Sequence, residues 1–231
     1  MQQQEKQSVS ERIAQHMSEQ IIHGELVEGE RIQEVRIAAE LDVSRGSVRE
    51  ALLLLERTQL IEIFPRRGAI VTEMSAPQVR ALFDTSALLL RQMVSRMAET
   101  WRMADAEKMQ QLLAQLHEAT ALGQTEKFYD LIFQSLAHQH DLVANPYLMK
   151  FYQDLLPSLR RSYFLTLNIS RRELQESFEL FKWVTDAVLS RKSQQATLFM
   201  DDFCRHLRNL VLESLTRMKQ IELAWARRSR R

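Results

Sequence analysis

The chain of 231 residues is long enough for one large domain or two smaller ones, and its 45% apolar content is that of a globular protein with a buried core. Five glycines and four prolines are too few for a sandwich or barrel with many tight turns, so the composition predicts a mainly α-helical fold. The formal net charge of +1 favours no particular partner, and Cys204, as the single cysteine, excludes an intramolecular disulfide.

The start of the chain, MQQQEKQSVSER, is polar and contains no hydrophobic signal segment. No run of about 18 apolar residues appears further on, so the sequence predicts no membrane span. A lone cysteine is typical of a reducing compartment. We therefore expect a cytoplasmic protein that has no membrane partner.

The first predicted element is a helix over residues 8–23, whose apolar residues recur at helical spacing. Ser8 and Glu11 fit a capping box at its start, and Gly24 ends it. A loop and a second, shorter helix over about 33–41 follow. The first two elements thus form a helix pair.

A third helix is predicted from about 45 to 58, with Ser44 as its N-cap. Residues 60–64 alternate in polarity and residues 69–72 form a return strand, with Pro-Arg-Arg-Gly as the turn between them. The buried stripe of the third helix follows the spacing i, i+3, i+4, i+7 and consists of Val48, Ala51, Leu52 and Leu55.

The front of the third helix differs from its rear. Small residues (Ser44, Gly46 and Ser47) let the helix end approach another backbone, and its free N–H groups can bind phosphate. Arg45 and Arg49 are long enough to reach base edges or phosphates. A helix-turn-helix protein presents the start of its recognition helix to DNA in this way, although arginines four apart are also typical of a plain solvated face.

Charge complicates this interpretation, because residues 1–75 contain nine Lys/Arg against thirteen Asp/Glu, a net charge of −4. Phosphate contacts need cations. The cations of this segment must therefore gather on one face, and the available set is Arg36, Arg45, Arg49, Arg66 and Arg67.

The stretch IIHGELVEGERIQEVRIAAELDVSRGSVREALLLLERTQLIEIFPRRGAIV resembles the DNA-binding domain of GntR-family transcription regulators. Two positions depart from the family pattern: Gly46-Ser47 replaces a usual Pro or Thr before Val48, and Gln59 stands where Gly is usual, which predicts a modified turn before the hairpin. The matching positions are Gly24, Gly29, Ile32, Glu34, Ala38, Val43, Ser44, Arg45, Val48, Arg49, Glu50, Ala51, Leu52, Leu55, Leu60, Gly68 and Val71.

The resemblance implies a winged helix-turn-helix DNA-binding domain over residues 8–73. Arg45 and Arg49 would be the main contacts to bases and phosphates, and Arg36 would touch the DNA backbone. Gly68 at the hairpin tip would enter the minor groove. The complete implied DNA-binding set is Arg36, Ser44, Arg45, Gly46, Ser47, Arg49, Arg66, Arg67 and Gly68.

The second domain is predicted over residues 77–225 as an all-helical bundle. Its helices are expected near 77–100, 104–122, 125–143, 146–166 with a potential break at Pro157, 171–191 and 193–225. The bundle resembles the FCD effector domain of the FadR branch of the GntR family. The shared features are Asp130-x-x-Phe133, Ala144-Asn145-Pro146, Asp186-Ala187-Val188, Ala196 and Met200.

Many FCD domains hold a divalent metal with one Asp and three His. In this chain the corresponding positions are Asp130, Gln134, Phe181 and Phe203, and amide or phenyl groups cannot make a tight transition-metal site. The resemblance therefore implies an FCD domain that lacks the usual metal histidines, with no metal and no cofactor. An alternative is a shifted site made of Asp130, His138 and His206.

The altered positions also suggest what the bundle binds. With Ser86, where the family has Arg, the implied effector site consists of Ser86, Asp130, Gln134, Phe181 and Phe203. This set is more apolar than a metal site and favours a lipophilic, acyl-type effector. The alternative is that the phenyl rings simply fill the core and nothing is sensed.

No hydrolase, metalloprotease or nucleotide-binding motif is present, so the chain is not expected to be an enzyme. We expect a homodimeric transcriptional regulator, most simply a repressor, that binds a near-palindromic DNA operator under the control of a small-molecule effector. The alternatives are a helical interaction or scaffold protein and a ligand-independent, nucleoid-type DNA binder.

Overall fold

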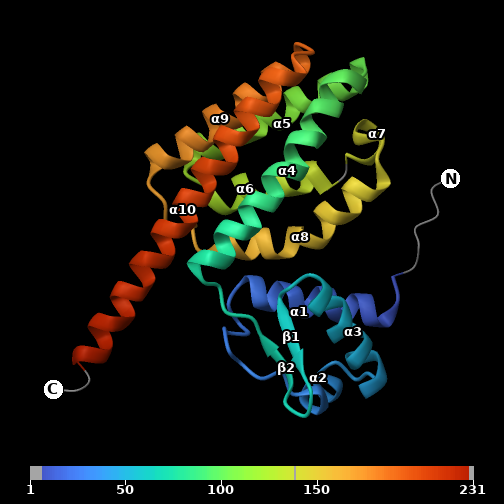
Figure 1. Cartoon of the computed structure of the whole chain (residues 1–231), viewed down its shortest axis with the longest axis vertical. Helices are drawn as coiled ribbons and strands as arrows, with labels where there is room; N and C mark the ends of the chain where they lie inside the picture. The colour runs from blue at the N-terminus through green and yellow to red at the C-terminus, as the bar shows by residue number, and fades with distance from the viewer. Residues whose placement is uncertain (1–6, 138, 229–231) are drawn as a thin grey trace. The chain divides into compact units, whose positions relative to one another are not determined.

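The computed structural model describes residues 7–137 and 139–228, and the fold is mainly α-helical (Figure 1). The chain divides into two compact units: an N-terminal unit, which comprises the chain up to Met74 together with Asp154–Arg161, and a helical unit, which comprises Ser75–Gln153 and the chain from Ser162 onward. In the described part of the chain, no helix is long and apolar enough to cross a membrane.

The N-terminal unit has the predicted order of three helices and a hairpin. Its two strands are antiparallel, and Phe64 lies opposite Gly68 at the tip. This is a winged helix-turn-helix, in which we call the hairpin with its turn the wing. The elements are α1 (Val9–Ile22), α2 (Glu34–Glu40), α3 (Arg45–Arg57), β1 (Ile61–Phe64) and β2 (Gly68–Val71).

The helix starts follow the sequence closely. The Ser8 hydroxyl accepts the Glu11 N–H and the Glu11 carboxylate accepts the Ser8 N–H, which confirms the predicted capping box. α1 and α3 pack against each other through apolar stripes, in which Met17 and Val48 are fully buried. The later turns of α3 are therefore anchored in the core of this unit.

The turn before the wing contains a residue in the left-handed conformation that favours glycine. Gln59, where the GntR pattern has glycine, adopts a left-handed backbone conformation with φ of 59°. For a residue with a Cβ atom this conformation costs about 1–2 kcal/mol. Gln59 thus adopts, at an energetic cost, a backbone conformation that glycine would adopt without strain.

A pairing that the sequence analysis did not predict joins the loop before α2 to β2. Gly29 N donates to Val71 O over 3.0 Å, Val71 N donates to Glu30 O over 3.0 Å, and Ile32 N donates to Ala69 O over 2.9 Å. These bonds follow the antiparallel pattern, so this segment acts as a short third strand. It fixes the base of the wing to the rest of the unit.

The helical unit is an all-α bundle. Figure 1 shows α4, α9 and α10 side by side, and α10 makes its most extensive contacts with α4 and α9. The elements are α4 (Ala76–Thr100), α5 (Met103–Leu122), α6 (Thr125–Ala137), α7 (His140–Val143), α8 (Pro146–Phe164), α9 (Arg171–Leu189) and α10 (Ser193–Arg228).

Two expectations for this unit need correction. The single helix expected over 125–143 is divided into α6 and α7, and the Thr100 hydroxyl at the end of α4 donates to Leu142 O in α7 over 2.6 Å. α8 continues through Pro157 without a break. A proline removes one backbone hydrogen bond, which does not by itself end a helix that is packed along its length.

Candidate functional sites

The front of α3 is exposed and its rear is buried, as predicted. The Ser44 hydroxyl accepts the Ser47 N–H over 3.0 Å and so caps the helix. Arg45 and Gly46 are exposed, and Arg45 has no ion-pair partner among the described residues. The first turn therefore presents free N–H groups, two small residues and one unpaired guanidinium to solvent.

Arg49 is exposed but not unpaired. Its Nε donates to Glu34 Oε2 over 2.9 Å, while 66% of the Arg49 side chain and 27% of the Glu34 side chain remain accessible. This bond uses only Nε, and the terminal nitrogens have no acceptor in the described part of the chain. The carboxylate therefore orients the guanidinium and leaves its outer edge available.

Arg36, the candidate on α2, also meets a carboxylate. Its Nε lies 2.8 Å from Glu40 Oε1, and both side chains are more than half exposed. An exposed pair one helical turn apart stabilises a helix by only about 0.3–0.5 kcal/mol. A phosphate could replace Glu40 at little cost.

The wing presents two further cations. Arg67 N donates to Phe64 O over 3.2 Å, and Arg66 has φ of 65°, the geometry of a type II turn with Arg66 at its third position. Arg66 and Arg67 are exposed and have no ion-pair partner within the described ranges. Gly68 follows with φ of 81°, so any side chain there would be strained.

The structure brings together two of the candidate effector residues. The rings of Phe181 on α9 and Phe203 on α10 are buried and meet edge to face, with centroids 5.4 Å apart. Two positions that carry metal-binding histidines in many FCD domains are thus neighbours here and are filled by an aromatic pair.

The other three candidates differ from this pair in burial and in hydrogen bonding. Ser86 is buried, and its hydroxyl donates to Leu82 O over 2.7 Å, within α4. Asp130 is half-buried and Gln134 is exposed, because α6 turns Tyr129, Phe133 and their neighbours inward instead. None of the three lines the cavity described next.

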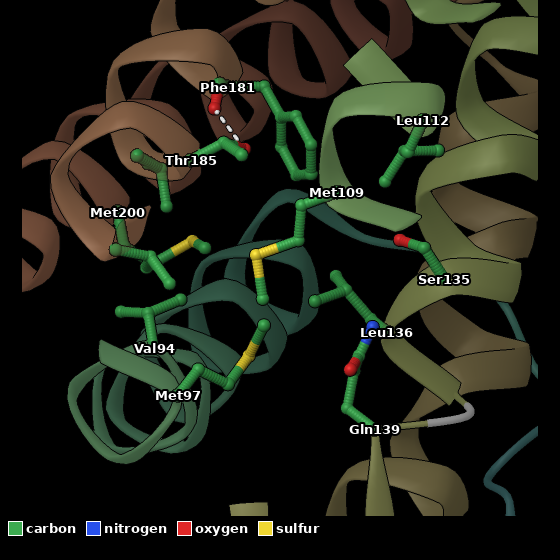
Figure 2. Close-up of a pocket in the computed structure, with 12 residues that line it drawn as sticks. Val94, Met97, Met109, Leu112, Ser135, Leu136, Gln139, Phe181, Thr185 and Met200 are labelled. Carbon is green, nitrogen blue, oxygen red and sulfur yellow. Dashed lines mark hydrogen bonds between the residues drawn. The ribbon is translucent and has the colours of Figure 1, made fainter. Parts of the chain in front are cut away.

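A small apolar cavity lies beside Phe181. Its volume is about 30 Å³, room for about two water molecules. Figure 2 shows the side chains of Met97, Met109 and Met200 directed into the same space, with the Phe181 ring above them. The lining consists of Val94, Met97, Met109, Leu112, Ser135, Leu136, Gln139, Phe181, Val184, Thr185, Val188 and Met200.

The polar atoms of this cavity are few. The Thr185 hydroxyl donates to Phe181 O over 3.1 Å, so it is satisfied within α9 (Figure 2). Ser135 in α6 and Gln139 after it lie on one side of the cavity, with Leu136 between them, and the Ser135 hydroxyl donates to Ile132 O over 2.8 Å. The cavity thus has an apolar body and one weakly polar side. The signal that could have indicated it is the set of methionines on three helices, since methionine adapts to irregular spaces.

No three metal-binding side chains lie together among the described residues. Of the alternative shifted site, His138 is outside the described residues. His206 Nε2 lies 2.9 Å from the Ser177 hydroxyl, and burial lowers the pKa of His206 against the opposing effect of Glu176 and other carboxylates.

Two family models match the chain. "Bacterial regulatory proteins, gntR family" matches residues 9–71, and the FCD domain matches residues 81–209, more than half of the chain. The chain belongs to the GntR family. It is a GntR-type DNA-binding transcriptional regulator with an FCD effector domain, and its family is one of regulators and not of enzymes.

Curated relatives agree with this assignment. The gluconate operon transcriptional repressor of Bacillus subtilis (strain 168) is 25% identical over 177 residues, which cover 75% of this GntR regulator and 71% of that protein. LutR of the same strain is 25% identical over 210 residues, covering 82% and 94%. The repressor RspR of Escherichia coli (strain K12) is 28% identical over 130 residues, covering 54% and 55%.

Solved structures show the same fold. McbR/YncC of E. coli superposes with a TM-score of 0.76 at 20% identity, over 90% of this chain and 99% of that one. A GntR-type putative regulator from Rhodococcus sp. RHA1 gives a TM-score of 0.69 at 19% identity, over 90% and 99%. The arrangement of a winged helix-turn-helix with an FCD bundle is therefore common to proteins with little sequence in common.

Proposed function

We propose that this GntR regulator is a homodimeric repressor that binds a near-palindromic operator. Residues 8–73 form its DNA-binding domain and residues 77–225 its effector-binding and dimerisation domain. The base and phosphate contacts come from Arg36, Ser44, Arg45, Gly46, Ser47, Arg49, Arg66, Arg67 and Gly68. Because its target is bacterial chromosomal DNA, the protein acts in the cytoplasm.

The observation that carries this proposal is the state of the first turn of α3. An unpaired Arg45 and an oriented Arg49 stand one helical turn apart beside a capped helix start with two small residues. A recognition helix needs this combination, because its N-terminal residues contact base edges while its later turns stay in the core. One such helix reads a half-site, and two-fold symmetry doubles the contacts.

Selection of bound duplexes from fragmented genomic DNA tests the proposal. We expect enrichment of one short near-palindrome. Unrelated DNA of equal length should not compete with it for the protein. A scaffold protein would enrich nothing, and a nucleoid-type binder would retain all fragments alike. Either result would reject sequence-specific regulation.

We further propose that a small lipophilic molecule is the effector and enters at the Phe181 side of the FCD bundle. The cavity there is apolar and lined by Met97, Met109 and Met200, whose flexible side chains allow it to widen. Phe203 stands behind Phe181 and extends the apolar surface. Such a ligand would change the order or separation of the two DNA-binding domains and so release the operator.

A thermal-shift screen tests the effector class. Fatty acids and acyl thioesters should raise the melting temperature, since a ligand that binds only the native state stabilises it by mass action. Citrate with zinc should not. The lipophilic assignment fails if only the carboxylate with metal stabilises the protein, and a bundle that no ligand stabilises has a core filled by its own rings.

A further inference from the structure

Arg31 occupies a defined place on the outer face of the wing. On β2, Ala69 and Val71 are buried, so the alternation of a strand turns Gly68 and Ile70 outward. Arg31 pairs with Ile70 from the short third strand, and its neighbour Ile32 is buried. The Arg31 side chain therefore lies on the outer face with Ile70 and Gly68.

Its guanidinium reaches towards the wing tip. Nε of Arg31 lies 3.8 Å, and one terminal nitrogen 3.9 Å, from the point that a Cβ atom on Gly68 would occupy. Arg66 and Arg67 are exposed in the turn that precedes this glycine. Three arginines, supplied by two separate segments of the chain, thus lie at one end of the hairpin.

Within the described ranges, Arg31 forms no ion pair with an acidic side chain. Glu62 faces Ile70 from β1 on the same row of the sheet, yet no ion pair joins it to Arg31 among the described residues. By contrast, the carboxylates of Glu34 and Glu40 are engaged by Arg49 and Arg36. In a segment of net negative charge, an exposed unpaired arginine beside the wing has an open position for an anion.

We propose that Arg31 binds a DNA phosphate on the strand that borders the groove entered by the wing. The inference rests on the proposed DNA-binding function and adds a contact from outside the helix-turn-helix and the hairpin turn. A guanidinium matches a phosphate with two parallel N–H donors. The main-chain pairing to β2 holds Arg31 in register, so the contact is made as soon as Gly68 approaches the groove.

The test measures binding of a short duplex, selected from random DNA by the wild-type protein, over a range of salt concentrations. Arg31→Gln should weaken binding about tenfold at physiological salt. The slope of log K against log salt should lose about one unit for each protomer, because each lost phosphate contact retains about 0.9 counterion. Arg31→Lys keeps the charge and should keep the slope. Arg172→Gln, an exposed arginine on α9 in the other unit, should change neither quantity.

Arg49→Ala separates the two levels of the proposal. If Arg49→Ala abolishes binding while Arg31→Gln leaves affinity and slope unchanged, the Arg31 contact is refuted and the recognition helix stands. If neither variant changes binding, the proposed DNA interface itself is refuted. A change in A·T preference at the wing without a change in slope would mean that Arg31 contacts bases, and that would also overturn the phosphate assignment. Near-ultraviolet circular dichroism of each variant reports whether the unit remains folded.

Discussion

The ion pair between Arg49 and Glu34 sets the direction of the guanidinium that we propose contacts DNA. The two residues are 15 positions apart and join the front of α3 to the first turn of α2. Glu34 is the more buried partner, so it acts as a fixed support for a more mobile arginine. The carboxylate also repels phosphate. We therefore expect Glu34 to raise specificity, because it favours only those DNA sites that Arg49 reaches in this orientation.

Glu34→Gln tests this selectivity. Removing the charge should strengthen binding to unrelated DNA, while loss of the Arg49 orientation should weaken binding to the operator. The difference in binding free energy between operator and unrelated DNA should therefore shrink by about 1 kcal/mol. Fluorescence anisotropy with both duplexes measures this difference. Glu40→Gln is the matched control, because it removes the same charge from the same helix and should strengthen both affinities equally. Equal changes in the two variants would show that Glu34 acts only as a charge.

At this scale the sequence predicted which residues carry the charge but not how they are paired. Arg45, Arg66 and Arg67 are exposed as expected. The engagement of Arg49 depends on a contact between two helices, and the position of Arg31 depends on a strand pairing across 39 residues, from Arg31 to Ile70. Neither leaves a local pattern in the chain. A polar residue followed by an apolar one, as in Arg31-Ile32, is too short an alternation to predict a strand.

Helix elements in both units begin with serine caps, and these caps have different consequences. Ser44 caps α3 and Ser170 caps α9, each by accepting the N–H of the third helical residue. The cap of α3 lies at the surface proposed to meet phosphate, whereas the cap of α9 is part of the FCD bundle. We therefore expect the same chemistry to support recognition in one unit and stability alone in the other.

Replacing each serine by alanine separates these roles. Ser44→Ala and Ser170→Ala should each lower the free energy of unfolding by about 1 kcal/mol, as measured by chemical denaturation. Ser44→Ala should in addition weaken operator binding several-fold, because a hydroxyl and an ordered helix start are lost from the interface. Equal operator affinity in the two variants would show that the start of α3 is not part of the binding surface.

The elements themselves were largely predictable. Caps, periodicity and glycine positions located α1, α3 and the wing to within about two residues, because these signals act within one or two helical turns. The division between α6 and α7 was missed, and α7 is bonded instead to Thr100, which is distant in the sequence. The methionine-lined cavity was missed for a similar reason: Met97, Met109 and Met200 meet only after three helices have packed.

The core of the whole FCD bundle contributes a dependence of stability on pH. Burial, together with the Asp201 carboxylate, raises the pKa of the Cys204 thiol from 9.0 to about 12. In the native state the Cys204 thiol therefore keeps its proton at pH values where the thiol of the unfolded chain releases it. Because the unfolded state then binds fewer protons, stability is complete below pH 9 and falls as the pH rises from there towards 12.

Chemical denaturation at several pH values checks this effect. Wild-type protein should lose more stability between pH 8 and pH 10 than Cys204→Ala, because alanine has no proton to release. The comparison uses the change in the free energy of unfolding with pH. The packing that the alanine variant loses is the same at every pH and does not affect this change. Parallel curves would show that Cys204 does not contribute. Alkylating reagents should also label the thiol only in unfolded protein, since the thiolate is the reactive form.

On the scale of the whole molecule, regulation requires that the first turn of α3 discriminate between DNA sequences. Operator affinity of Arg49→Ala and Arg45→Ala, relative to affinity for unrelated DNA, measures this most directly. Each substitution should reduce the difference in binding free energy between operator and unrelated DNA by about 2–6 kcal/mol, because a symmetric dimer loses one contact in each half-site. Circular dichroism and the oligomeric state should be unchanged. If both variants bind operator and unrelated DNA with the wild-type ratio, α3 does not read the sequence and the account is wrong.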